Sequence, residues 1–228
     1  YKGNLQPSGI KQAIYRLAGV IYVNAAATGA NTGASWSDAF TDLQLALDMT
    51  EANSYTEIWV AAGTYTPTKE VGGTGSRYRS FQLKNGVGVY GGFNGTETSW
   101  GQRNWELNQT ILSGDLNNND NTNIAYYELT RQDNCYHIFY HPTGLNLNNS
   151  AILDGCVITG GNASGDDFIF DINRGGGMNN SYSSPTLNNC SFSANTARGG
   201  GGGMSNSNAK PVITNCILNL NSALGFGG

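Results

Sequence analysis

The densest group of potential metal ligands is the segment DLNNNDNTN, which begins at Asp115. Asp115, Asn117 and Asn119 occupy positions 1, 3 and 5 of a calcium-type loop, and Asp120 follows directly. Oxygen ligands at this density suit calcium, although the usual glycine at position 6 and the glutamate at position 12 are missing. The segment therefore predicts either a calcium site formed by these four residues or a polar surface loop.

Candidates for acid and base chemistry are sparse. A polysaccharide lyase needs a base and a group that neutralises a uronate, and a glycoside hydrolase needs paired carboxylates. The residues whose types suit these roles are Asp167, Asp171, Arg174 and Arg198. Asp166 and Asp167 are adjacent, so on a strand they would point to opposite faces. We expect solvation or ion pairing for these residues, which form no convincing catalytic set.

The histidines and cysteines do not form an evident metal site. His137 and His141 lie four residues apart in the β-forming segment CYHIFYHP, so on a strand they would share one face. A third ligand is missing nearby. The four cysteines contain no zinc-type CxxC pair and are too few for a disulfide scaffold. Packing is the expected role of both residue types.

Aromatic residues in turn-rich segments are the remaining candidates for ligand binding. Trp100, Trp105, Tyr126 and Tyr182 are expected to be at least partly exposed, and aromatic rings stack on the faces of sugars. The alternative is that these rings cover the edges of the fold.

The composition narrows the function classes. Charged residues make up 12% of the 228 residues and the net charge is −4, with no basic patch of the kind that nucleic-acid binders carry. No apolar run approaches the roughly 18 residues of a membrane span. Turns rich in Asn, Ser, Thr and Gly favour secreted β-structure. The start at Tyr1 suggests a processed or recombinant fragment whose leader is removed.

Two near copies of one segment dominate the C-terminal part of the chain. Met178 and Met204, Pro185 and Pro211, and Cys190 and Cys216 are all 26 residues apart, and such a period predicts a solenoid. An earlier copy, AILDGCVITGGN, aligns Leu153 with Leu187 and Cys156 with Cys190 at a distance of 34, with an insertion in SGDDFIFDINR. QTILSGDL, around Ile111, predicts a still earlier copy. The chain stops partway through a copy, so we expect a longer natural protein.

Each copy predicts one coil of three short strands separated by Gly, Asn and Ser turns. The apolar bursts alternate with the strand period of two. Stacked coils would place equivalent side chains in ladders, including an amide ladder of Asn189 over Asn215 and inward-facing cysteines. Leucine-rich repeats need more leucines, and calcium-binding nonapeptide repeats need an Asp after the glycines. The pattern favours an all-β, right-handed parallel β-helix with three sides.

The N-terminal half predicts a cap for this solenoid. SWSDAFTDLQLALDM has apolar residues at helical spacing and N-cap candidates at Ser35 and Ser37, which predicts a capping helix over about 36–50. TEIWVAAGTY predicts the first strand, and FQLKNGVGVYGGF predicts two strands around Asn85-Gly86. We predict a lead-in segment over 1–20, a single β-helix domain over 21–228, and regular coils from about 175.

Several segments together resemble a known class of protein. IWVAAGTYTPT, GVYGGFNGTETSWGQRN, TILSGDL, ILDGCVITGGNA and the GGGM…SPTLNNCSFSANTA copies are similar to the pectin-lyase-like β-helix regions of large bacterial secreted and surface-anchored proteins, over roughly 20–228. GGGM and FSAN also resemble the repeats of chlamydial polymorphic outer-membrane adhesins, although LNLN at 218–221 lacks the Phe. The resemblance implies a fold and a location, and it carries no agreed catalytic residues.

The expected function is that of an extracellular or cell-surface β-helix acting as a structural or adhesive stalk that binds glycans or a partner surface. The alternative is a polysaccharide lyase or glycoside hydrolase acting on uronate-containing polysaccharide, which rests on fold analogy alone. Unpaired strands at the coil ends also predict self-association.

Overall fold

The described part of the chain is built mostly of β-strands in parallel sheets. The computed structural model describes residues 19–52, 55–166, 172–225 and 227–228. Within these ranges it contains the α-helix α1 (Leu43–Ala52) and the 3₁₀ helices η1 (Ser76–Tyr78), η2 (Trp100–Gln102) and η3 (Leu129–Arg131). The all-β class predicted from the repeat is therefore correct.

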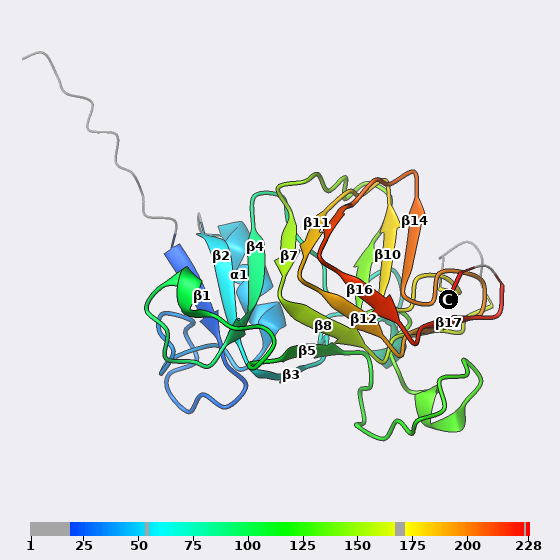
Figure 1. The fold of residues 1–228 in the computed structure, drawn as a ribbon, viewed down its shortest axis with the longest axis horizontal. Helices are drawn as coiled ribbons and strands as arrows, with labels where there is room; N and C mark the ends of the chain where they lie inside the picture. Colours follow the sequence, from blue (N-terminus) through cyan, green and yellow to red (C-terminus); the bar gives the residue numbers. More distant parts are fainter. Residues whose placement is uncertain (1–18, 53–54, 167–171, 226) are drawn as a thin grey trace, which may run out of the picture.

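The largest sheet has six strands in the order β1-β2-β4-β7-β11-β15. These strands are β1 (Gly19–Val23), β2 (Tyr55–Ala61), β4 (Gly88–Phe93), β7 (Ile152–Asp154), β11 (Thr186–Asn188) and β15 (Val212–Thr214). Each pairs in parallel with the next, and Figure 1 shows them following one another in chain order from β1 to β11. We call it the first sheet.

A second sheet of five strands has the order β16-β12-β8-β5-β3. It consists of β3 (Gly63–Tyr65), β5 (Thr110–Ser113), β8 (Cys156–Thr159), β12 (Ser191–Ser193) and β16 (Ile217–Asn219). Its strands are again parallel neighbours, and the strand at Thr110–Ser113 confirms the predicted early copy around Ile111.

Two smaller parallel sheets have three strands each. One contains β6 (Phe139–His141), β10 (Met178–Ser181) and β14 (Met204–Ser207), and the other contains β9 (Asn162–Ala163), β13 (Thr196–Ala197) and β17 (Ser222–Ala223). Each late copy thus has four strands, one in each sheet, rather than the three predicted. The fourth strand escaped the sequence pattern because its two residues, such as Thr196 and Ala197, are too few to show a period.

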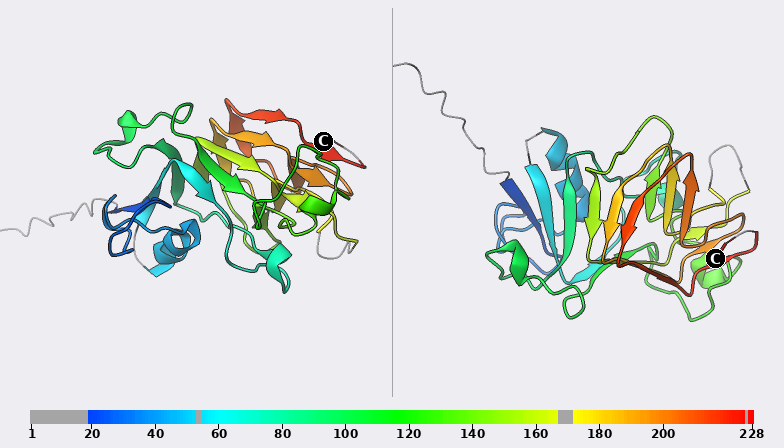
Figure 2. Two further views of the ribbon diagram at one scale, coloured as in Figure 1. Left: turned by 90° about the horizontal axis from the view of Figure 1, so that it is seen from below. Right: turned by 45° about the horizontal axis from the view of Figure 1, so that its top comes forward.

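The pairing register matches the spacing of the sequence copies. Met178 is opposite Met204 and Phe192 is opposite Leu218, both at the predicted spacing of 26. Leu187 lies opposite Leu153 as well as Ile213, so the earlier copy at a distance of 34 is also in register. The predicted stacking of equivalent side chains is confirmed, and Figure 2 shows the same order of strands in two further views.

The N-terminal helix is shorter than predicted. It starts at Leu43, and Asp42 caps it because the Asp42 carboxylate accepts the Gln44 backbone N–H at 2.8 Å. Neither Ser35 nor Ser37 is the N-cap. Phe40 lies before the helix and forms a parallel bridge with Val23, while the Asp38 carboxylate accepts the Ala30 backbone N–H. The helical spacing of Trp36 and Phe40 therefore reflects packing from a loop, not a helix face.

Two other predicted boundaries also shift. β1 begins at Gly19, so the end of the predicted 1–20 segment already belongs to the first sheet, and residues 1–18 lie outside the described ranges. Of the two strands predicted around Asn85-Gly86, only β4 forms. Phe81 makes a single bridge with Phe139, and the ladder does not continue because the Leu83 backbone N–H donates to the side chain of His141 rather than to a backbone carbonyl.

One hydrophobic core runs through the sheets. Columns of apolar side chains from successive strands fill it, including Leu153 under Leu187 and Ile158 under Phe192, all of them fully buried. Asparagines at the corners adopt positive φ, 50° at Asn189 and 51° at Asn215, a conformation that asparagine tolerates better than most residues. At these corners the chain changes direction, so that successive strands of one copy pack around the same core.

Candidate functional site

The corner between the first and second sheets carries a groove of about 500 Å³. One wall comes from the loop before β5, and the floor comes from the same corner in three successive copies. We call it the Trp105 groove. Its lining residues are Trp105, Glu106, Gln109, Gly155, Cys156, Val157, Asn189, Cys190, Ser191, Asn215 and Ile217.

Trp105 is held in place by a buried cation. The guanidinium carbon of Arg103 lies 5.0 Å from the centre of the Trp105 ring, 4.2 Å from that of Trp100 and 5.4 Å from that of Tyr90. The Arg103 side chain is only 2% exposed and forms a 2.8 Å ion pair with Asp154. Cation–π contacts of this kind strengthen when water is excluded. The two predicted tryptophans are thus brought together around one arginine.

The floor of the groove presents a line of side-chain amides. Asn189 Nδ2 donates to Asp154 Oδ1 at 2.9 Å, and Asn215 Nδ2 donates to Asn189 Oδ1 at 3.4 Å. The predicted ladder of Asn189 and Asn215 therefore forms, and it ends on the same carboxylate that binds Arg103. An exposed indole beside amide groups and the Glu106 carboxylate can pack against an apolar sugar face and hydrogen-bond to its hydroxyls.

The sequence did not reveal Arg103 or Asp154 as parts of this site. Arg103 lies between the two tryptophans in WGQRNW, which was the only available signal. Its ion pair joins residues 51 positions apart. The other two aromatic candidates lie elsewhere: Tyr126 packs edge-to-face on Tyr127, and Tyr182 is exposed after β10. Neither lines the Trp105 groove.

The predicted catalytic residues do not assemble into a described site. Asp167 and Asp171 lie outside the described ranges. Arg198 forms an ion pair with Asp166, and Arg174 pairs through its backbone with Gly200 rather than with Arg198. Both arginines are exposed, and both line a depression of about 760 Å³ beside the last copy. The two arginines therefore do not occupy equivalent positions in successive copies.

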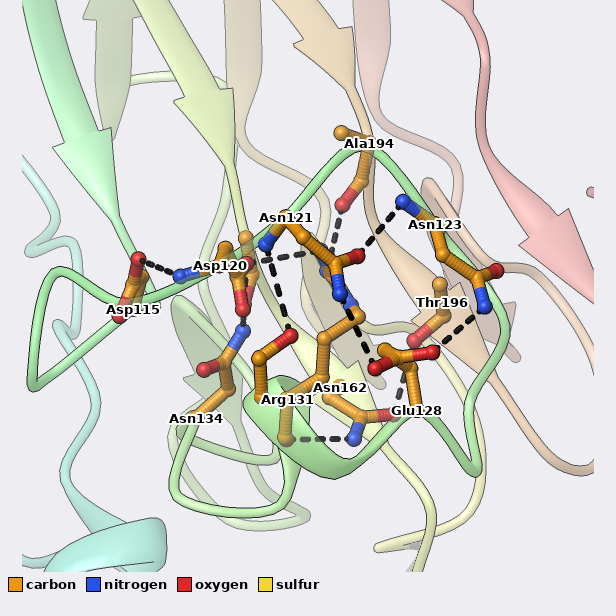
Figure 3. Close-up of polar contacts among 12 residues, drawn as sticks. Asp115, Asp120, Asn121, Asn123, Glu128, Arg131, Asn134, Asn162, Ala194 and Thr196 are labelled. Carbon is orange, nitrogen blue, oxygen red and sulfur yellow. Dashed lines mark hydrogen bonds and ion pairs between the residues drawn. The ribbon is translucent and has the colours of Figure 1, made fainter.

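In the predicted calcium loop, the carboxylates of Asp115 and Asp120 accept hydrogen bonds from the protein itself. Asp115 accepts the backbone N–H groups of Asn119 at 3.2 Å and Asp120 at 3.0 Å. Asp120 Oδ2 accepts Arg131 at 2.7 Å and Asn134 at 3.0 Å, as Figure 3 shows.

Arg131 supplies the cation that pairs with Asp120 in this loop. It is fully buried, and its other terminal nitrogen donates to the carbonyl of Ala194 at 2.7 Å. Burial raises the pKa of Asp120 and lowers that of Arg131, while their attraction opposes both shifts. Calcium would have to share Asp120 with Arg131, and the described residues contain no cluster of three or more His, Cys, Asp or Glu suited to a metal. Calcium binding stays a prediction for titration to decide.

The histidines have structural partners. His141 Nε2 accepts the Leu83 backbone N–H at 3.1 Å, so Nδ1 carries the proton and donates to Asn180 Oδ1 at 2.7 Å. Asn180 in turn donates to Asn206 at 2.8 Å. His137 contacts the Gly175 carbonyl at 3.0 Å. Burial lowers the pKa of both histidines to about 4, so both are neutral at physiological pH.

Comparisons with known proteins place no constraint on this chain: no protein-family model, curated protein or solved structure matches it. Among the described residues, no helix is both long enough and apolar enough to cross a membrane.

Proposed function

We propose that this chain is a right-handed parallel β-helix module of a secreted or cell-surface protein, and that it binds glycans through the Trp105 groove. The solenoid is supported by strands that repeat in the same sheets at a 26-residue register. The right-handed sense is supported by the strong preference for that hand when a chain crosses between parallel strands of one sheet.

The observation that carries the glycan proposal is the fixed, partly exposed indole beside a row of amides. Trp105 is 36% exposed, and its orientation is set by the stacked Arg103. Because little conformational entropy is lost when such a preorganised ring binds, the site suits a flat polyhydroxyl ligand. Repetition of the corner along the copies would extend the site in the direction of stacking, as an adhesive stalk requires.

The charges favour a neutral glycan over the uronate substrate of a polysaccharide lyase. Glu106 adds a negative charge to the groove, and the cation beneath it, Arg103, is already paired with Asp154. Within the described lining of the groove, a lysine, arginine or histidine that could act as base or bind a uronate is missing. The lyase and hydrolase alternatives therefore receive no support from this site.

The test is binding of the purified chain to a panel of neutral and uronate-containing polysaccharides. We expect binding to neutral glycans, with Kd weakened about tenfold or more by Trp105→Ala because an aromatic anchor is removed. Tyr182→Ala is the matched control, since Tyr182 is an exposed aromatic (52%) outside the groove. Equal affinity of the Trp105→Ala and wild-type chains would refute the assignment, and release of unsaturated products from uronates would favour the lyase.

A further inference from the structure

Three of the four cysteines occupy the same place in successive copies. Cys156 begins β8, Cys190 immediately precedes β12 and Cys216 immediately precedes β16. The Ile217 backbone N–H donates to the Cys190 carbonyl at 2.9 Å, so the last two cysteines lie on directly neighbouring, parallel chain segments. All the cysteines are free thiols.

The last two thiols point the same way, into the corner of the core. Cys190 Sγ donates to the Leu153 carbonyl at 3.6 Å, and Cys216 Sγ donates to the Leu187 carbonyl at 3.5 Å, which is the equivalent group one copy later. Because a thiol has a single proton, Cys190 can instead donate that proton to Cys216 Sγ, and this favours the thiolate form of Cys216. They differ in access, because Cys190 is buried and Cys216 is only partly covered.

We propose that Cys190 and Cys216 form a thiol–disulfide exchange couple, in which Cys216 attacks a low-molecular-weight disulfide and Cys190 resolves the product. Neighbouring strands lie about 4.8 Å apart, within the roughly 4.4–6.8 Å between Cα atoms that a disulfide spans. Redox-sensing cysteines are solvent-accessible and often lie next to a second cysteine that resolves the first product.

The exchange balances without any further reactant. The Cys216 thiolate attacks one sulfur of the small disulfide, forms a mixed disulfide and expels one thiolate. Cys190 then loses its proton and attacks Cys216 Sγ, which expels the second small thiol and leaves a Cys190–Cys216 disulfide. Two protein thiols are oxidised, and one small disulfide is reduced to two thiols. The product covalently joins the last two copies.

The surroundings of the thiols support this division of roles. The hydrogen bond from Cys190 lowers the pKa of Cys216 to about 7, whereas burial raises the pKa values of Cys135 and Cys156 to about 12. Burial, together with this hydrogen bond, raises the pKa of Cys190 well above its usual value. A thiol with a pKa near the ambient pH is the most effective attacking group.

The experiment treats the folded chain with oxidised glutathione and follows the mass of the intact protein and of its peptides. We expect the wild-type chain to lose two hydrogen atoms and gain a 190–216 cross-link. Cys190→Ser should stop at a stable mixed disulfide on Cys216, and Cys216→Ser should not react. The rate of the first step should rise only about tenfold between about pH 6 and about pH 8, compared with nearly a hundredfold for an ordinary thiol.

The control is a Cys135→Ser, Cys156→Ser double variant, which keeps the couple and should react like the wild type. Circular dichroism verifies that each variant is folded before treatment. Three results would overturn the proposal: an unreactive folded wild-type chain, modification at Cys135 or Cys156, or a wild-type mixed disulfide that Cys190 never resolves.

Discussion

Leu187 offers the sharpest test of the stacked core. It is fully buried and lies between Leu153 of the preceding copy and Ile213 of the following one. Truncating a fully buried leucine to alanine removes its packing on both sides and leaves a cavity. We expect Leu187→Ala to lower the free energy of unfolding by about 3 kcal/mol.

Ile213 is the matched control, because it occupies the same column one copy later. Ile213 is 44% exposed, whereas Leu187 is 0% exposed. Ile213→Ala removes the same number of carbon atoms, but only about half of their surface is buried. We therefore expect a loss of about 1.5 kcal/mol, half that of Leu187→Ala.

Urea unfolding of the three proteins, followed by far-ultraviolet circular dichroism, measures both losses. The midpoints should shift while the slope with urea stays constant, since the surface exposed on unfolding changes little. Equal losses at the two positions would refute the reasoning, because they would mean that the following copy does not cover Leu187.

Three further predictions concern buried charge. Since burial lowers the native pKa of His137 and His141 from 6.5 to about 4, the unfolded chain takes up their protons first on acidification. The free energy of unfolding should be at its full value above about pH 6.5 and fall by up to about 3 kcal/mol per histidine towards pH 4. Urea unfolding at several pH values measures this dependence, and His141→Gln should make it weaker. Arg131→Met should cost about 3–5 kcal/mol by leaving Asp120 unpaired, and adding Asp120→Asn should restore part of it. EDTA should leave the melting temperature of the wild type unchanged, whereas calcium should stabilise Arg131→Met; a calcium-dependent rise in the wild type would show that Arg131 is not the effective counter-ion.

The repeat made much of the late part of the fold predictable. Cys190 and Cys216 carry the same spacing as Met178 and Met204, and a shared spacing over several positions leaves little choice of register. The early part was harder. Trp36 and Phe40 have helical spacing but lie in a loop. Hydrophobic periodicity indicates which residues are buried, but a loop can bury residues at that spacing as well as a helix can.

The candidate site was only half visible in advance. Trp100 and Trp105 were recognised as aromatic candidates, but nothing in their spacing revealed the guanidinium between them. The acidic loop shows the same limit: the sequence reveals the oxygen ligands around Asp115, but not that Arg131, 11 residues away, pairs with Asp120. Electrostatic pairing depends on distances in space that short sequence windows do not contain.

The sequence by itself determined the strand class, the copy length and which side chains stack, since identical neighbours in successive copies satisfy one another's hydrogen bonds and packing. Only the tertiary structure decided that Arg103 bridges to Asp154, that the Asn189 ladder ends on that carboxylate, and that Arg131 closes the acidic loop. Each of those contacts involves a residue that the repeat does not conserve, and their energy depends on burial that is created only when the sheets have formed.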